Sequence, residues 1–523
     1  MLKRKILIVL ILIVVICSVL VLAVSMTPTK DIAENSIETP VKPVVLIVVD
    51  SLMSEPLQRV IAEGKAPALS FLINNGNFHP EVISSYPTMS VTIDSTLVTG
   101  TYADRHKIPG LIWYKDKENR IISYGSGIRE IWNNGVKNVV MDSVIRLNES
   151  HLSKTAVTIH EELAERGLSS ASVNGLVYRG SFKQELHVPK LLSMVKLLPK
   201  EVEVDGPTLL SLGTLSQYNP ENDRSKFIWK RMGVNDDFTA NELVYLIEQG
   251  KLPSFTLAYL PDADASIHKN GPGDTKGIEK ADQALQQMLN SYSSWEEAVQ
   301  ETTWIVLGDS GQSSVKENKK DALIDLNSLL EGYTFWEGGH TDAQLAIAIN
   351  ERMAYIYIND EQIQLSDIVD VLKKDERIGF IAWSDRQTNH VVGTKGDEGM
   401  TFSPDGPRVD EYGQSWHLEG NVSLLDIKMD GQEVLHYDAY PDALARLHGA
   451  LHSQNGKVII VDAKPSYEFI EKHSHDHAGG GAHGSLHKVD SIVPLIVAGA
   501  DEPYVPERLV DMKKWILQLL SGR

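Results

Sequence analysis

The chain has 523 residues, 42% hydrophobic and 23% charged, which is the balance of a globular protein with one large domain or two to three smaller ones. Its formal net charge of −20 argues against binding of long nucleic acids, whose phosphates need Lys and Arg, but it permits small phosphate esters, because metal ions can reverse the field inside a cleft. Cys17 is the only cysteine, which excludes an intrachain disulfide, a cysteine-based zinc knuckle and a cysteine nucleophile in the rest of the chain.

The N-terminal segment, residues 1–26, is predicted to be a membrane anchor. Basic residues at positions 3–5 precede an apolar run over 6–24, which is long enough to span a bilayer at about 1.5 Å per residue. Because the positive charges come first, the N-terminus is expected in the cytoplasm and the bulk of the chain outside the cell membrane. A cleaved signal peptide is the alternative, since 23–25 offers a small-x-small site. The polar residues 27–42 are predicted to be a linker.

The remainder, residues 43–523, is predicted to be one large domain of the α/β class with insertions. Its apolar runs predict buried strands, and helical patterns lie between them; the runs are 44–49, 255–260, 304–307, 457–461 and 492–498. Such alternation predicts a doubly wound, mostly parallel sheet, in which ligands bind at the carboxyl ends of the strands. Two insertions are expected: a cap at about 113–242, and a small α+β unit at about 340–435 with strands over 345–358 and 379–383 around a helix over 365–374.

A hydroxyl-rich stretch, Ser84–His106, follows the first predicted strand. Pro87 ends what precedes it, and Thr88, Ser90 and Thr92 then stand where a helix could begin, with Gly100 able to end it. A hydroxyl at a helix N-terminus lies beside free backbone N–H groups, which favour a phosphoryl group. Taken alone, the stretch is more typical of an ordinary helix cap without chemistry, because such caps are common.

Four further groups of polar residues fall at predicted strand ends. Asp50 follows the first strand, Asp264 and His268 the second, and Asp309 the third, while His483 precedes the last. Asp264 and His268 are four residues apart, so they could share one face of a turn or short helix. Each element alone is common, and His473 to His487 could be merely a solvated histidine tract. Together, Asp and His side chains at strand ends indicate a site for divalent metal ions.

The order and spacing of these blocks resemble the alkaline phosphatase superfamily, in particular its type I phosphodiesterase/nucleotide pyrophosphatase branch. The nucleophile block of that branch is matched by Tyr86-Pro-Thr-Met-Ser90, Thr96-Leu-Val-Thr-Gly100 and Tyr102-Ala-Asp-Arg-His106. The metal-ligand blocks are matched by the segments around Asp264 and His268, and by His483-Gly-Ser485. The resemblance implies that Ser90 is the nucleophile and that Asp264, His268 and His483 hold one metal ion. It also implies that Asp50 and Asp309, with Ser90, hold a second.

Three positions depart from the family pattern. Ser310 stands where the family has a His ligand, Ile93 where it has an Asn, and Ile267 where it has a Gly. A second site made of Asp50, Asp309 and hydroxyls would be all oxygen, which suits Mg²⁺ or Mn²⁺, whereas Asp264, His268 and His483 suit Zn²⁺ or Mn²⁺.

The expected function is metal-dependent hydrolysis of small phosphate esters, either phosphodiesters, pyrophosphates or phosphomonoesters. The expected route is a covalent phosphoryl-Ser90 intermediate on the extracytoplasmic side of the cell membrane. Thr88 and Thr92 are the alternative nucleophiles. A binding protein of another class, anchored at the surface on the same fold and impaired in catalysis at Ser310 and Ile93, is the alternative function.

Overall fold

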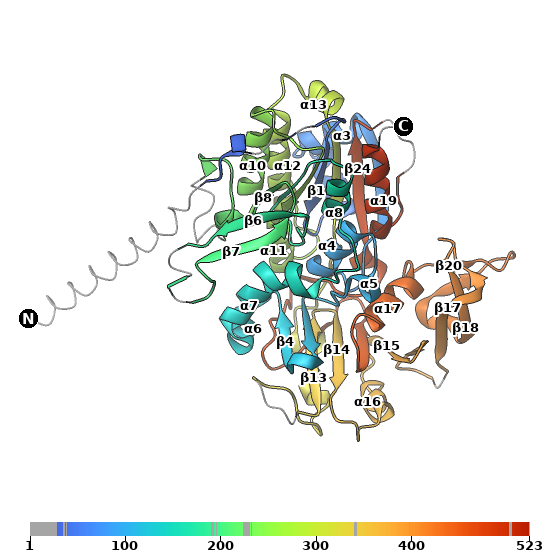
Figure 1. Ribbon diagram of the computed structural model, residues 1–523. Helices are drawn as coiled ribbons and strands as arrows, with labels where there is room; N and C mark the ends of the chain where they lie inside the picture. Colours follow the sequence, from blue (N-terminus) through green and yellow to red (C-terminus); the bar gives the residue numbers. More distant parts are fainter. Residues whose placement is uncertain are drawn as a thin grey trace, which may run out of the picture.

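A mixed seven-stranded sheet lies at the centre of the fold (Figure 1). The computed structural model describes residues 29–34, 37, 39–189, 193–194, 196–222, 231, 233–338, 343–396, 398–500 and 505–521. The strands of this sheet, in spatial order, are β2(Gly76–Ile83), β24(Ile492–Ala498), β10(Thr303–Gly308), β1(Val44–Val49), β9(Phe255–Leu260), β5(Ser170–Val173) and β8(Leu209–Ser211). The strands from β10 to β8 are parallel, and β24 runs antiparallel to both of its neighbours. The prediction of a mostly parallel sheet is therefore confirmed, with β24 as its reversed strand.

The central strand β1 shows why this sheet forms. Its side chains alternate between two hydrophobic clusters, with Val44, Leu46 and Val48 on one face and the residues between them on the other. A continuous β-branched run of this kind suits a strand that is covered on both faces. The prediction from the sequence that β1 is fully buried is thus confirmed.

Helices cover both faces of this sheet, as a doubly wound fold requires (Figure 1). One face is covered by α2(Ser54–Ala62), α3(Pro67–Asn74), α10(Asp236–Glu248), α12(Lys276–Leu289) and α13(Trp295–Glu301). The other is covered by α4(Ser90–Thr99), α8(Ile159–Glu165), α17(Ala443–Leu451) and α19(Leu509–Leu520).

A second seven-stranded sheet, antiparallel throughout, is larger than the small α+β unit that the sequence predicts. Its strands are β13(Leu345–Asn350), β14(Met353–Ile358), β21(Lys457–Ala463), β15(Ile378–Asp385), β16(Thr388–Val392), β17(Met400–Val409) and β18(Ser415–Gly420). The predicted strand 457–461 therefore pairs here and not in the first sheet. The run 345–358 is two strands joined by the turn Glu351-Arg352. The turn was not predicted because both strands are largely buried, so the sequence on either side of it is apolar.

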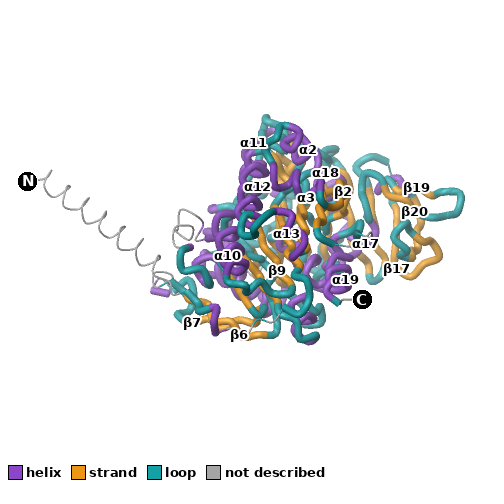
Figure 2. The backbone as a smooth tube through the Cα atoms, turned by 90° about the horizontal axis from the view of Figure 1, so that it is seen from above, coloured by secondary structure: helices purple, strands orange, loops and turns teal. Residues whose placement is uncertain are grey.

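The second sheet shares its core with the first. Along β14, Met353, Tyr355 and Tyr357 join the cluster that also lines the α4 face of the first sheet, while the alternate residues pack toward α16(Leu365–Leu372). The far strands β17 and β18, with the hairpin β19(Ile427–Met429) and β20(Leu435–Tyr437), extend away from α10 and α12 (Figures 1 and 2).

The range 113–242, expected to be a cap, supplies both sheet strands and separate small elements. It contains β5, β8, α8 and most of α10. The separate elements are β4(Arg120–Ser123), which pairs with β3(Ile112–Lys115), α6(Ile128–Asn134), α7(Val136–Met141), η3(Asp142–His151) and the hairpin β6(Phe182–His187) and β7(Glu201–Gly206).

The predicted membrane anchor, residues 1–26, lies outside the described residues. Among the helices that the structure does describe, none combines the length and the apolar character needed to cross a bilayer.

Candidate active site

The carboxyl ends of three neighbouring strands lie level at one edge of the first sheet. In the pairing register, Val49 at the end of β1 stands opposite Leu260 of β9 and Gly308 of β10. Asp50 and Asp309, the residues that follow β1 and β10, therefore start from the same edge. The helix α11(Asp262–Asn270) begins there too, just after β9. This is the place where parallel α/β sheets hold ligands.

Asp264, His268 and His483 come together as the sequence predicts. Asp264 and His268 are one turn apart on α11, and the Nε2 atom of His268 lies 3.0 Å from Oδ1 of Asp264. Nε2 of His483, from the loop between β23(Gly481–Ala482) and α18(Lys488–Ser491), lies 3.8 Å from the same oxygen. The ligand atoms of the three residues are all within 4.8 Å of one another. We call these three residues the imidazole half-site.

The second ring nitrogen of each of these histidines is engaged with a backbone carbonyl. Nδ1 of His268 donates to the oxygen of Gly481 at 2.8 Å, and Nδ1 of His483 donates to the oxygen of Thr88. A proton fixed on Nδ1 leaves the Nε2 lone pair free, which is the arrangement of metal-binding histidines. The residues of the imidazole half-site therefore fit a metal ion.

Two more residues lie beside the imidazole half-site, and the sequence analysis did not identify either of them as a ligand. Oε1 of Glu351 lies 3.7 Å from Nε2 of His268 and 3.8 Å from Nε2 of His483. The ring of His477 stacks on that of His268 with 4.3 Å between centroids, and its Nδ1 donates to Glu468 at 2.7 Å. His477 belongs to the histidine tract seen in the sequence. Glu351 has no signal there, because it lies in the unpredicted turn between β13 and β14.

Asp50 and Asp309 form a second group of acidic residues together with Asp94 of α4, and we call these three the carboxylate half-site. Oδ2 of Asp50 accepts from the Tyr259 hydroxyl at 2.5 Å, and Oδ1 of Asp309 accepts from two backbone N–H groups. Oδ1 of Asp50, Oδ2 of Asp309 and both oxygens of Asp94 are buried without a hydrogen-bond partner in the described structure. Buried oxygens of this kind fit a hard cation such as Mg²⁺ or Mn²⁺.

Ser51 and Gln312 connect the two half-sites, and neither was predicted from the sequence. The Ser51 hydroxyl donates to Asp264 at 2.9 Å and lies 3.2 Å from that of Ser310. Nε2 of Gln312 donates to Asp264 at 2.8 Å and to the Ser51 hydroxyl at 2.9 Å. Ser310, which replaces the family's histidine, thus forms part of a hydroxyl and amide network around Asp264. The sequence contains only two signals for this network: Ser51 is adjacent to Asp50, and Gln312 ends the Gly-Asp-Ser-Gly-Gln block.

The two half-sites have opposite electrostatics. Burial disfavours a charged His268, but the carboxylates of Asp264 and Glu351 outweigh it and raise the pKa of His268 to about 10. Burial alone would raise the pKa of Asp264, yet His268 and His483 hold it below its usual value. In the carboxylate half-site, burial and the nearby Asp309 raise the pKa of Asp50 and of Asp94 well above the usual range. Burial also raises the pKa of Asp309 to about 6, against the stabilising N–H of Ser51.

Ser90 is the first residue of α4, whose N-terminus lies next to the His483 loop. The carbonyl of Thr88 accepts from His483, and the Thr88 hydroxyl accepts from the N–H of Gly484 at 2.7 Å. Thr88 and Thr92 are both fully buried, whereas Ser90 is half-buried and reaches solvent. Asp94, a member of the carboxylate half-site, lies one turn further along α4 on the same face of the helix as Ser90. The role of Ser90 as nucleophile stays a prediction.

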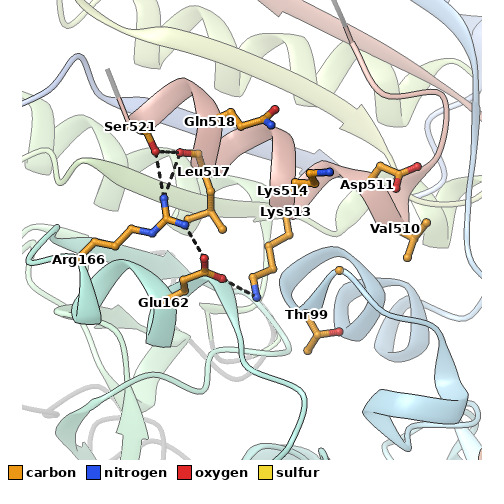
Figure 3. Close-up of a pocket in the computed structure, with 11 residues that line it drawn as sticks. Thr99, Glu162, Arg166, Val510, Asp511, Lys513, Lys514, Leu517, Gln518 and Ser521 are labelled. Atoms are coloured by element: carbon orange, nitrogen blue, oxygen red, sulfur yellow. Dashed lines mark hydrogen bonds and ion pairs between the residues drawn. The ribbon is translucent and has the colours of Figure 1, made fainter. Parts of the chain in front are cut away.

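A separate hollow of about 470 Å³ lies at the other end of α4, between α8 and α19 (Figure 3). Lys513 and Arg166 both reach Glu162 there, at 3.0 and 2.5 Å, and Arg166 also donates to the Ser521 hydroxyl. These two cations are paired within the hollow, and no residue of either half-site is among those that line it.

Comparison with solved structures shows the same fold in proteins of distant sequence. The chain is similar to murine ectonucleotide pyrophosphatase/phosphodiesterase 5 (ENPP5, NPP5), at 14% identity and a TM-score of 0.54, over 92% of this chain and 95% of that one. The human ENPP5 structure gives the same values. An inactive form of the murine protein in complex with AMP is similar over 92% of this chain and 96% of that one.

A search of curated protein sequences finds no significant match to this chain. The family model of type I phosphodiesterase/nucleotide pyrophosphatase, in contrast, matches residues 44–486, a range that contains the strand-end residues described above. The resemblance seen in the sequence is therefore confirmed, and the chain belongs to the type I phosphodiesterase/nucleotide pyrophosphatase family, a family of phosphate-ester hydrolases.

Proposed function

We propose that this protein hydrolyses small phosphodiesters or pyrophosphates, with a nucleotide as one portion of the substrate, through a covalent intermediate on Ser90. Family membership supports hydrolysis of phosphate esters over a mere binding role. The AMP complex of murine ENPP5 supports a nucleotide portion. The observation that carries the proposal is the meeting of Asp264, His268 and His483 at the strand edge, beside the N-terminus of α4.

Metal ions held in the two half-sites would polarise the phosphoryl oxygens and favour the ionised Ser90 hydroxyl. Ser90 Oγ attacks phosphorus in line, and the bond from phosphorus to the leaving oxygen breaks as the new P–O bond forms. Water then attacks the same phosphorus and releases the Ser90 hydroxyl with the second product. The first N–H groups of α4 have no acceptor within the helix, so they can bind a non-bridging phosphoryl oxygen.

The ions expected are Zn²⁺ or Mn²⁺ in the imidazole half-site and Mg²⁺ or Mn²⁺ in the carboxylate half-site. The donor sets support this division, because imidazole nitrogens favour borderline metals and oxygens favour hard ones. Metal analysis of the purified protein tests it. Two tightly held zinc ions per chain would contradict the division.

The test of the nucleophile is the variant Ser90→Ala assayed on bis-nitrophenyl phosphate and mono-nitrophenyl phosphate with added Mg²⁺, Mn²⁺ and Zn²⁺. We expect loss of nearly all nitrophenol release, because no other solvent-accessible hydroxyl stands among the three candidates. Thr92→Val is the matched control, since its hydroxyl is buried without a hydrogen-bond partner in the described structure, and it should keep most activity. Full activity in Ser90→Ala, or its loss in Thr92→Val alone, would refute the assignment.

We further propose that residues 1–26 anchor the protein in the cell membrane with the catalytic domain on the extracytoplasmic side. The charge order around the run 6–24 supports this orientation. Protease treatment of intact cells should degrade the catalytic domain, and deletion of residues 1–26 should leave it in the cytoplasm. Protection of the full-length protein in intact cells would contradict the orientation.

A further inference from the structure

We infer that Glu351 is the fourth protein ligand of the metal ion held by Asp264, His268 and His483. The inference rests on the proposed metal-dependent function, and it adds a residue that belongs to the second sheet. It makes this half-site a four-ligand site with two imidazoles and two carboxylates, a set whose charges balance a divalent cation.

The distances fit one ion. In a tetrahedral zinc site with ligands at about 2.0–2.1 Å, neighbouring ligand atoms are about 3.4 Å apart. The Oδ1 of Asp264 lies 3.0 Å and 3.8 Å from Nε2 of the two histidines. Oε1 of Glu351 lies 3.7 Å and 3.8 Å from the same two nitrogens. Each of the two carboxylate oxygens thus lies within 3.0–3.8 Å of both imidazole nitrogens, as ligands of one shared ion would.

Glu351 is held in place by the loop that carries His483. Its other oxygen, Oε2, accepts from the N–H of His483 at 2.9 Å, and the N–H of Arg352 donates to the His483 oxygen at 2.9 Å. Arg352 is fully buried, pairs with Asp490 and donates to the oxygen of Ala463 at 3.1 Å. The turn and the His483 loop therefore form one rigid support, so Oε1 is directed at the imidazoles by fixed contacts.

The backbone at Glu351 points to the same role. Glu351 is the first residue of the two-residue turn between Asn350 and Met353, and its φ is 56°. Glycine is favoured where such a turn needs a positive φ, and a residue with a Cβ there is strained. A glutamate side chain at this position is thus present at an energetic cost, which its carboxylate can recover when it binds a cation.

His477 marks the competing arrangement, in which the ion lies between His268, Glu351 and His477. The ligand atoms of these three also lie within 4.8 Å of one another. The Nε2 atom of His268 has one lone pair and so serves one ion. We assign that ion to the Asp264 side, where two residues besides Glu351 approach the same nitrogen.

The test is zinc affinity, measured on chelator-stripped protein by competition with a chromophoric chelator. We expect Glu351→Gln to bind zinc at least about tenfold more weakly than the wild type. The amide keeps an oxygen for the His483 N–H, so the fold of the turn is retained. His477→Asn is the matched control, because its amide can still donate to Glu468, and its zinc affinity should stay within about threefold of the wild type.

Zinc binding by Glu351→Gln within about threefold of the wild type would overturn the inference, and so would an equal loss in His477→Asn. The variant Asp264→Asn tests the proposed function separately. If its zinc affinity equals that of the wild type, the proposed metal site is wrong, and not only the role of Glu351 in it. If Glu351→Gln does not fold, a zinc-loaded crystal of the wild type decides. An ion at about 2.0–2.2 Å from Oε1 of Glu351 supports the inference, and one more than about 3 Å away overturns it.

Discussion

The two halves of the candidate active site differ in how their buried charges are compensated. In the imidazole half-site, the Nδ1 atom of each ring donates to a backbone carbonyl. The Asp264 carboxylate accepts from Ser51 and Gln312 and lies 3.0 Å from Nε2 of His268. In the carboxylate half-site, one oxygen each of Asp50 and Asp309, and both of Asp94, have no partner among the described residues. Each unmet buried acceptor costs about 1–3 kcal/mol, so the second half-site is the less stable one without a cation.

This difference has a consequence for function. The imidazole half-site is preorganised, and in the absence of metal a proton on His268 can take the place of the ion. The carboxylate half-site can relieve its repulsion only by protonation or by binding a cation. We therefore expect metal binding in the imidazole half-site to determine whether the protein is active. We expect the carboxylate half-site to determine how activity and stability depend on the concentration of hard cations in solution.

The largest predicted effect is that of Asp264→Asn. Asn keeps the shape and one acceptor but removes the charge that both histidines face, so kcat/KM should fall by at least about 10²-fold, the equivalent of several kcal/mol of metal catalysis. The measurement is hydrolysis of bis-nitrophenyl phosphate over a series of metal concentrations.

Asp309→Asn is the matched variant in the other half-site. Its activity should be low without added metal and recover in part at millimolar Mn²⁺ or Mg²⁺, whereas Asp264→Asn should not recover. Equal rescue of both variants by Mg²⁺ would mean that the two half-sites do not differ in the way proposed.

The next effect is on stability and concerns Asp94→Asn. Burial raises the pKa of Asp94 in the folded protein, so folding requires uptake of a proton and stability falls as pH rises above the unfolded value of about 4. The amide carries no charge, and the variant should therefore be more stable than the wild type by about 2–3 kcal/mol at pH 8 in the presence of chelator.

Thermal midpoints at pH 8 and pH 5 measure this gain, which should shrink at the lower pH. Added Mg²⁺ or Mn²⁺ should stabilise the wild type more than Asp94→Asn. A variant that is less stable than the wild type at both pH values would show that the Asp94 carboxylate is not under the repulsion described.

Much of the first sheet could be predicted from sequence because its strands are buried on both faces. Continuous apolar runs such as 44–49 leave little room for another structure, and the polar residue after each run marks the edge where ligands bind. The second sheet could not be placed in the same way. Its strand β21 has the same apolar character as β1, and only its pairing with β14 and β15 shows that it belongs elsewhere.

The candidate site shows a similar limit. Asp264, His268 and His483 could be foreseen because their spacing is a family pattern, and the structure brings them together. Glu351 could not, since it reaches the site from a turn hidden in the apolar run 345–358 and without a glycine to signal it. Ser51 and Gln312 could not either, because their contacts depend on the close approach of two strand ends.

The smallest predicted effect is that of a substitution at His106. This histidine ends the hydroxyl-rich stretch Ser84–His106 and lies in the helix α5(Ala103–His106), and its environment differs from that of the histidines in the imidazole half-site. Its Nδ1 accepts from the N–H of Ile108 at 3.1 Å, and Nε2 lies 3.2 Å from the Thr96 hydroxyl, so neither nitrogen is free for a metal. Burial lowers the pKa of His106 to about 3. Since the unfolded chain binds a proton below pH 6.5 and the folded one does not, stability should be lost as pH falls from 6.5 toward 3.

His106→Asn keeps an acceptor for Ile108 and cannot titrate. The loss of ring packing should lower its stability at pH 7, but its further loss between pH 7 and 5.5 should be smaller than that of the wild type by about 1.4 kcal/mol. Zinc affinity should be unchanged, in contrast to variants of the imidazole half-site. An unchanged pH dependence would mean that His106 is protonated in the folded protein, which would also require the Ile108 hydrogen bond to break.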